Sequence, residues 1–215
     1  MINNNLFNKS FSCFIFFEEL GKLEDLYIEQ EEHNEKSLMS WEKFLENSTK
    51  GFTDEEKNAF AVWHIDDYLK YSNDYPQVIR KTIFLQTYFS FESYLNNVCD
   101  SQKKQLYLNL SYKDMKGQGI ERAKLYLCKA CGLITDAFSS NEWKSIRDYN
   151  TLRNAFVHNN GIVDKSNLKT DHPGLILTNS SPKKDSALCS IELQRDFIDE
   201  VFKTMREFGS KLEGQ

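Results

Sequence analysis

The chain has 215 residues, of which 40% are hydrophobic and 27% charged, and its net charge is −5. These values are ordinary for a globular protein, and only 9 Gly and 3 Pro are too few for the frequent turns of an all-β sandwich or barrel. No apolar run approaches the ~18–20 residues needed to cross a bilayer, and five cysteines, an odd number, do not suggest a disulfide framework. The composition therefore predicts a mainly helical, reduced, cytoplasmic protein without a membrane segment.

The first part of the chain has the spacing of amphipathic helices. Apolar residues at i, i+3 and i+4 predict a helix over residues 11–35, and a shorter helix is expected over 38–46. Thr53 and Glu56 have the spacing of a capping box, which should open a helix running to about Tyr71. Pro76 indicates a new helix start, because proline is tolerated in a first turn.

The rest of the chain predicts four core helices, over residues 75–106, 119–131, 140–159 and 192–212. Gly132 is expected as a left-handed cap, and Ser139-x-x-Glu142 as a second capping box. Residues 162–190 predict a loop or a small β-hairpin before the last helix. The expected fold is all-α: an antiparallel up-and-down bundle over residues 75–215, with an acidic helical N-terminal extension, residues 1–74, packed against it.

Charge is distributed unevenly along the chain. Residues 1–75 hold 16 Asp/Glu against 7 Lys/Arg, whereas residues 103–158 hold 10 Lys/Arg against 5 Asp/Glu. An acidic total argues against broad nonspecific binding to a polyanion, but a basic segment can still attract phosphate because the local field follows nearby charges.

The basic segment ends in the stretch "YNTLRNAFVHNNG", residues 149–161. On a helical wheel the apolar face consists of Tyr149, Leu152 and Phe156, with Ile146 and Val157 at its border. A neighbouring polar row consists of Arg147, Asn150, Asn154 and His158. Arg153 falls on the apolar side, where a guanidinium is costly unless it is paired or lies at an interface or cleft.

These side chains suit metal-free cleavage of RNA. His158 can exchange a proton near neutral pH, Arg153 offers a planar fork of donors to phosphate oxygens, and Asn154 can orient a hydroxyl or phosphate. His158 would then deprotonate the ribose 2′-hydroxyl or protonate the leaving 5′-oxygen, while Arg153 stabilises the phosphorane-like transition state. The spacing alone, however, favours a C-capping histidine beside a surface arginine.

The segment "LRNAFVHNNG" resembles the hallmark of HEPN domains, in which Arg, a polar residue, three or more further residues and His end a bundle helix. Asn154 after Arg153 and the exit through Asn160 and Gly161 fit that pattern, and "TIFLQTYFSFESYLNNV" resembles the first core helix, including Glu92. The resemblance covers residues 75–212 in architecture and is specific over 152–161.

The resemblance implies a helical bundle that forms a homodimer with two Arg/His motifs facing each other. It also implies a metal-independent endoribonuclease of a toxin–antitoxin, abortive-infection or other antiviral system, with 2′,3′-cyclic phosphate products and no cofactor. Arg153 would be the phosphate-stabilising group, Asn154 the polar neighbour and His158 the general acid/base. An antitoxin or another defence component is a possible partner. The alternative is a catalytically inactive HEPN-like module for dimerisation or for binding RNA or protein.

Other candidates have less support. Asn150 and Arg147 are supporting residues of the motif helix, and Glu92 could pair with an arginine of that helix or be exposed. Cys128-x-x-Cys131 has redox or zinc spacing but no second pair, which favours two small buried residues. The remaining histidines are isolated from any metal-binding pattern, so no metal site is predicted: His33, His64 and His172.

Overall fold

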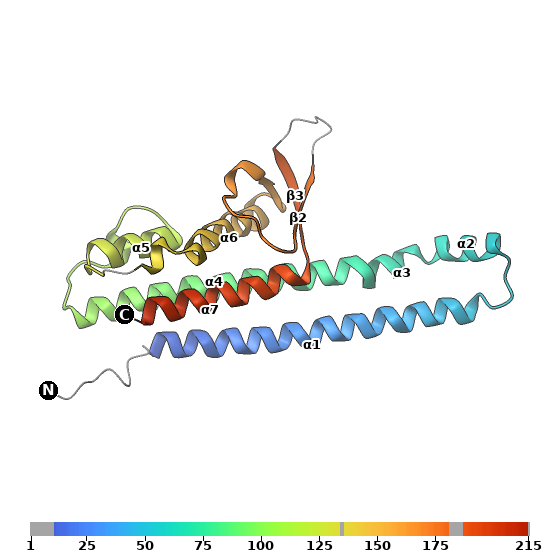
Figure 1. Ribbon diagram of the computed structural model, residues 1–215, viewed down its shortest axis with the longest axis horizontal. Coiled ribbons are helices and arrows are strands. Elements are labelled where there is room, and N and C mark those ends of the chain that lie inside the picture. Colours follow the sequence, from blue (N-terminus) through green and yellow to red (C-terminus); the bar gives the residue numbers. More distant parts are fainter. Residues whose placement is uncertain (1–10, 134–135, 181–186, 215) are drawn as a thin grey trace.

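The structure, a computed structural model, describes residues 11–133, 136–180 and 187–214. The helices are α1 (Phe11–Ser48), α2 (Asp54–Trp63), α3 (Ile65–Leu69), α4 (Tyr75–Gln105), α5 (Gly119–Lys129), α6 (Asn141–His158) and α7 (Arg195–Glu213). The strands are β1 (Ile162–Asp164), β2 (Leu175–Asn179) and β3 (Leu188–Leu193). The protein is thus mainly helical with one small sheet, as the sequence predicted (Figure 1).

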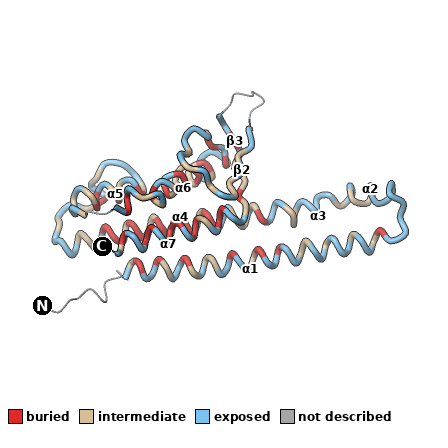
Figure 2. The backbone as a smooth tube through the Cα atoms, viewed as in Figure 1, coloured by how far each residue is buried: buried red, intermediate tan, exposed pale blue. Residues whose placement is uncertain are grey.

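Helix α4 is the centre of the bundle. Helices α1, α5, α6 and α7 all pack on it, and α1 and α6 run in the direction opposite to α4 and α7 (Figure 1). Because α4 is covered from several sides, it has no single apolar face, and aromatic residues are buried around it. Its largest buried side chains are Phe84, Tyr88, Phe91 and Tyr94. Buried residues concentrate in this part of the molecule (Figure 2).

Helix α1 is one helix of 38 residues, which corrects the prediction of separate helices over 11–35 and 38–46. No proline or glycine interrupts the sequence between those ranges, so the backbone has no reason to stop. Its first part joins the core through Cys13, Phe16, Leu20 and Tyr27. Glu31 is buried and forms a two-pronged ion pair with Arg80 of α4, at 2.9 and 2.7 Å, which fastens α1 to the bundle.

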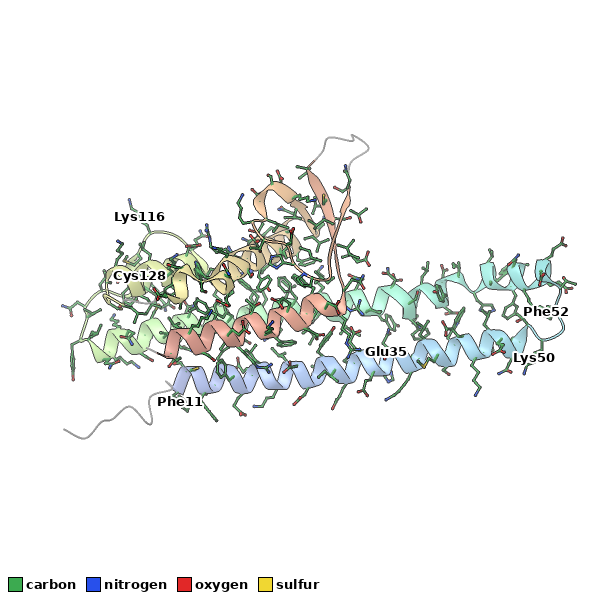
Figure 3. The ribbon with its side chains drawn as sticks, viewed as in Figure 1. Phe11, Glu35, Lys50, Phe52, Lys116 and Cys128 are labelled. Carbon is green, nitrogen blue, oxygen red and sulfur yellow. The ribbon has the colours of Figure 1, made fainter. Side chains whose placement is uncertain are left out.

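The second half of α1 continues beyond the bundle as one arm of a stalk (Figure 1). Glu35, labelled in Figure 3, pairs with Arg195 at the start of α7, and past this point α1 faces the segment that contains α2 and α3. Ring contacts such as Trp41 with Tyr68, at 5.5 Å, hold the two arms together. Most stalk residues are exposed or half-buried (Figure 2).

The return arm of the stalk differs from the single helix predicted over residues 53–71. The Thr53–Glu56 capping box is present, but the helix breaks at His64 and passes through a π-helical segment, Lys70–Asp74, into α4. Pro76 therefore does not open a new helix after a break, because Asp74 already has helical dihedral angles. The π-helical segment continues directly into α4, so Pro76 lies inside a continuous helical stretch of the backbone.

The predicted β-hairpin is present between α6 and α7, and a third strand extends it. The strand order is β1-β3-β2, all antiparallel, with Val163 opposite Cys189 and Leu177 opposite Ile191. Gln77 of α4 exchanges two hydrogen bonds with the backbone of Leu193, at 2.9 and 3.0 Å, so the sheet is tied to the bundle where α7 begins.

The two predicted caps near α5 and α6 had different outcomes. Gly132 has a φ of +67° after α5, as expected for a left-handed cap. The N-cap of α6 is Ser140 instead of Ser139: its hydroxyl accepts a hydrogen bond from the backbone N–H of Trp143 at 3.2 Å. Ser139 belongs to a short 3-10 turn, so it cannot adopt the extended N-cap conformation.

Candidate functional site

The apolar face of α6 lies in the core largely as the wheel predicted. Ile146, Tyr149 and Leu152 are fully buried, whereas Phe156 is half-buried and Val157 is 46% exposed. The C-terminal end of α6 is thus more exposed to solvent than its middle, and the motif residues lie at the boundary between the core and the surface.

Helix α6 ends in two consecutive left-handed residues. Asn160 has a φ of +51° and Gly161 a φ of +75°, and the backbone N–H of Gly161 donates to the carbonyl of Ala155 at 2.9 Å. A Cβ on Gly161 would lie 3.4 Å from the ring of Phe156. Asparagine and glycine are the residues that adopt this conformation most easily, so the Asn-Gly exit has a conformational reason.

Arg153 is half-buried against α4. Its guanidinium carbon lies 5.2 Å from the ring centroid of Phe89 and 5.9 Å from that of Tyr88. Nη1 donates to Oδ1 of Asn154 at 2.8 Å, while Nε is buried without a hydrogen-bond partner. Within the described part of the chain, no carboxylate lies within 4.0 Å of the guanidinium. Arg153 is therefore a cation stacked on aromatic rings without a counter-charge.

His158 is exposed, and none of the hydrogen bonds or ion pairs among the described residues involves its ring. At 100° and 1.5 Å per residue, His158 leaves the helix about 140° away from Arg153 and about 7.5 Å further along the axis. One chain therefore does not direct the two side chains at a single point. Asn154, by contrast, is only about 40° from His158 around the helix.

The supporting residues are engaged elsewhere. Arg147 pairs with Glu121 of α5 at 2.8 Å on the surface. Asn150 accepts a hydrogen bond from the hydroxyl of Tyr88 at 2.7 Å, and so links α6 to α4. Among the described residues Glu92 forms no ion pair with an arginine, and its carboxylate lies beside Gly119 at the start of α5. Of the two alternatives for Glu92, pairing with an arginine of the motif helix is therefore absent among the described residues, and the side chain is half-buried instead of exposed.

Tyr88 lies between these groups and is fully buried. Burial raises the pKa of its hydroxyl, and the carboxylate of Glu92 raises it further, while Arg153 acts in the opposite direction. Tyr88 is therefore a neutral donor near pH 7. Its hydroxyl donates a hydrogen bond to Asn150 and its ring contacts the guanidinium of Arg153, so Tyr88 fixes the position of α6 on α4.

A buried polar cluster that was not predicted lies one turn before Arg153. Asp148 is 1% exposed, and its carboxylate accepts hydrogen bonds from the backbone N–H groups of Lys169 and Thr170 and from the Thr170 hydroxyl, at 2.6 to 3.1 Å. His172 Nε2 lies 3.3 Å from the same carboxylate, and the imidazole packs on Tyr149 and Phe197. The cluster anchors residues 168–172, between β1 and β2, to α6.

A pocket of about 470 Å³ lies on the side of α6 that faces the sheet, next to Asn154. Its lining combines four uncharged polar side chains with aliphatic ones and a single carboxylate. The lining residues are Thr151, Asn154, Ala155, Asn159, Ile162, Val163, Asp164, Asn167 and Leu188.

The cysteine motif has no sign of chemical activity. Cys128 and Cys131 are half-buried free thiols, and burial raises the pKa of both, which disfavours a reactive thiolate. Within the described ranges, no group of His, Cys, Asp or Glu side chains is arranged to hold a metal ion. No helix in the described part of the chain has the length and apolar character of a membrane span.

Comparison of the chain with protein-family models, with curated proteins and with solved structures gave no significant match. The fold is a helical bundle with a small antiparallel sheet, and its helix α6 ends in the segment that carries Arg153, Asn154 and His158.

Proposed function

We propose that this protein is a metal-independent endoribonuclease of the HEPN type, acting in toxin–antitoxin or antiviral defence. The observation that carries the proposal is Arg153, a half-buried cation that stacks on Phe89 and has no counter-carboxylate among the described residues. Burying an unpaired guanidinium costs folding free energy, and binding of an anion offsets that cost. The phosphate groups of RNA are such anions. The resemblance of residues 152–161 to the HEPN hallmark gives the reaction class.

In the proposed reaction His158 removes the proton of a ribose 2′-hydroxyl. The 2′-oxygen then attacks the adjacent phosphorus and forms a 2′,3′-cyclic phosphate. The bond from phosphorus to the 5′-oxygen breaks, and that oxygen takes a proton from solvent to leave as a 5′-hydroxyl, while the imidazolium of His158 returns its proton to solvent. Arg153 stabilises the negative charge that builds on the phosphoryl oxygens, and Asn154 holds the guanidinium through its bond to Nη1.

A second copy of the chain would complete the site. Arg153 and His158 diverge by about 140° on one helix, so facing motifs of two copies are a simple way to bring an arginine and a histidine to one phosphate. The surface around Arg153 suits such a contact, since Phe89 and Val157 expose 37% and 46% of their area beside it. We therefore propose a homodimer formed through the α4–α6 face.

Purified protein incubated with structured and single-stranded RNA in EDTA tests the proposal. Cleavage is expected for the unaltered chain and lost in His158→Ala and Arg153→Ala, with helical circular dichroism and unfolding temperature unchanged. His33→Ala, on the stalk, is the matched control and should cleave normally. If no RNA is cut at any protein concentration, or if His158→Ala cuts as well as the unaltered chain, the proposal is wrong.

The second candidate is a noncatalytic module that binds RNA or a protein partner. It is favoured by one observation: among the described residues nothing holds the exposed ring of His158 in a fixed orientation, as a general base usually requires. In this case RNA would bind without being cut, and binding would survive His158→Ala but weaken in Arg153→Ala.

A further inference from the structure

The pocket between α6 and the sheet has no role in the reaction described above. It opens on the side of α6 that carries Thr151, Asn154 and Ala155, and β1 forms its opposite wall. We propose that this pocket binds a nucleobase of the RNA, next to the phosphate held by Arg153. The inference rests on the proposed ribonuclease function and extends it from the reaction to the choice of cleavage site.

The first argument is the hydrogen-bonding chemistry of the lining. Three of the lining side chains are carboxamides: Asn154, Asn159 and Asn167. Each offers a donor and an acceptor on one flat group, which matches the paired donors and acceptors on the edge of a base. Among the described residues, the amides of Asn159 and Asn167 have no hydrogen-bond partner, and Asn154 uses only its Oδ1. The amides are therefore available to a ligand.

The second argument is charge. No lysine or arginine belongs to the lining, and the one ionisable group there is the carboxylate of Asp164, which already accepts two bonds from Ser166. A phosphate inside the pocket would meet a negative charge and no positive one. The lining thus favours the uncharged part of a nucleotide, whereas the adjacent Arg153 favours the charged part.

The third argument is shape and position. Ile162, Val163 and Leu188 supply aliphatic walls, and enzymes that take a base out of its stack hold its faces between apolar or aromatic side chains. The volume of about 470 Å³ lies in the ordinary range of small-ligand sites. Asn154 belongs to the pocket and also binds Arg153, so one residue joins the two subsites.

Binding of the four uncharged nucleosides tests the pocket without requiring cleavage. Saturation-transfer NMR on the full chain is expected to detect at least one nucleoside. Its affinity should fall about tenfold or more in Asn167→Ala, because a contact to the edge of the base is lost, and likewise in Leu188→Lys. The matched controls, Asn97→Ala on α4 and Ile176→Lys on β2, lie outside the pocket and should bind as the unaltered chain does.

Sequencing of the RNA products provides the second readout: Asn167→Ala should change the nucleotide preference at the cleavage site, whereas the control Asn97→Ala should keep both the preference and the rate of the unaltered chain. If no nucleoside binds, or if the pocket variants and their controls bind alike, the inference is overturned, even when RNA is cut. If nucleosides bind through the pocket but RNA is never cut, the pocket stands and the ribonuclease proposal fails.

Discussion

Arg153 and Asn154 are consecutive residues whose side chains bind each other: Nη1 of the arginine donates to Oδ1 of the asparagine at 2.8 Å. The guanidinium therefore contacts the rings of Tyr88 and Phe89 on α4 and a polar side chain of α6 at the same time. The bond also leaves the amide nitrogen of Asn154 without a partner in the described chain, next to the pocket. This pair is where the proposed phosphate and base subsites meet.

Replacing the amide by a carboxylate should disable Arg153. In Asn154→Asp the guanidinium would gain a counter-charge at the position of Oδ1, and a phosphate would have to compete with it. We expect RNA cleavage to fall by about 100-fold, and by less in Asn154→Ala, which removes the bond without adding a charge. Initial cleavage rates of the two variants give the comparison. If cleavage is lost more in Asn154→Ala than in Asn154→Asp, Arg153 does not bind the phosphate. The control for the added negative charge is Asn97→Asp, which should cleave RNA as the unaltered chain does.

A charge on the exposed end of α6 should break the proposed dimer. Val157 is 46% exposed beside Arg153, and Val157→Glu would place a desolvated carboxylate in the contact. We expect a folded monomer by light scattering, with cleavage reduced in parallel. Val62→Glu, in the stalk, alters a valine that is 70% exposed and should leave both the mass and the cleavage unchanged. A monomeric unaltered chain that cleaves RNA would refute the two-copy site.

The Asp148 cluster should make the protein sensitive to acid. Burial alone would raise the pKa of the carboxyl, but hydrogen bonds from His172, Thr170 and two backbone N–H groups outweigh it and hold the pKa below its usual value. A lowered pKa in the folded state contributes stability that is complete above the unfolded value, about 3.9, and is lost as the pH falls through the folded value. The free energy of unfolding should therefore decline below about pH 4.

Asp148→Asn isolates this contribution. The asparagine has the same shape as the aspartate, but its amide group has one acceptor oxygen fewer. It cannot accept all the hydrogen bonds from Lys169 and Thr170, so the free energy of unfolding at pH 7 should fall by about 1–3 kcal/mol. Urea unfolding from pH 3 to 7 should show a shallower acid decline than in the unaltered chain. Asp66→Asn, at an exposed position of α3, is the control. An identical pH profile in Asp148→Asn and the unaltered chain would contradict the role of the carboxylate.

Two glycine substitutions should have opposite signs. Gly161→Ala puts a Cβ into a backbone with a φ of +75°, 3.4 Å from the ring of Phe156, and should destabilise the fold by about 1–2 kcal/mol. Gly21→Ala lies inside α1 with nothing within 4 Å of the new Cβ, and should stabilise by about 0.5–1 kcal/mol. Thermal unfolding of both variants gives the comparison. Stabilisation by Gly161→Ala would show that α6 does not end in the left-handed turn.

The helices of the bundle could be predicted from the sequence because their apolar residues recur at helical spacing and their ends carry local signals, such as Gly132. The predicted helix boundaries were wrong where no local sequence signal marks the start or the end of a helix. The continuity of α1 is consistent with the lack of proline and glycine between the two predicted ranges, but the apolar spacing on which the prediction rested stops where the helix leaves the bundle. The π-helical segment before α4 contacts α1, where the Asn34 amide donates to the carbonyl of Tyr71 at 2.8 Å, and no local pattern predicts a contact between residues so far apart.

In the candidate site, too, the residues of a local motif could be predicted, whereas those joined by long-range contacts could not. Arg153, Asn154 and His158 are found in one short motif, and the wheel indicated that Arg153 lies near the apolar side. The pairing of Asp148 with His172 joins residues 24 positions apart through an irregular loop, so no local pattern connects the two residues. An aspartate at a buried position of a helical wheel is the one signal that could have drawn attention to it.

The most direct test of the central claim is the chemistry of the RNA ends. Mass spectrometry of products made in EDTA should show 2′,3′-cyclic phosphates and 5′-hydroxyls, and an otherwise identical substrate with 2′-deoxyribose at the cleaved position should remain intact. His158→Ala should yield neither product. Products with 5′-phosphates, or cleavage of the 2′-deoxy substrate at the same position, would contradict attack by the 2′-hydroxyl and with it the role assigned to His158.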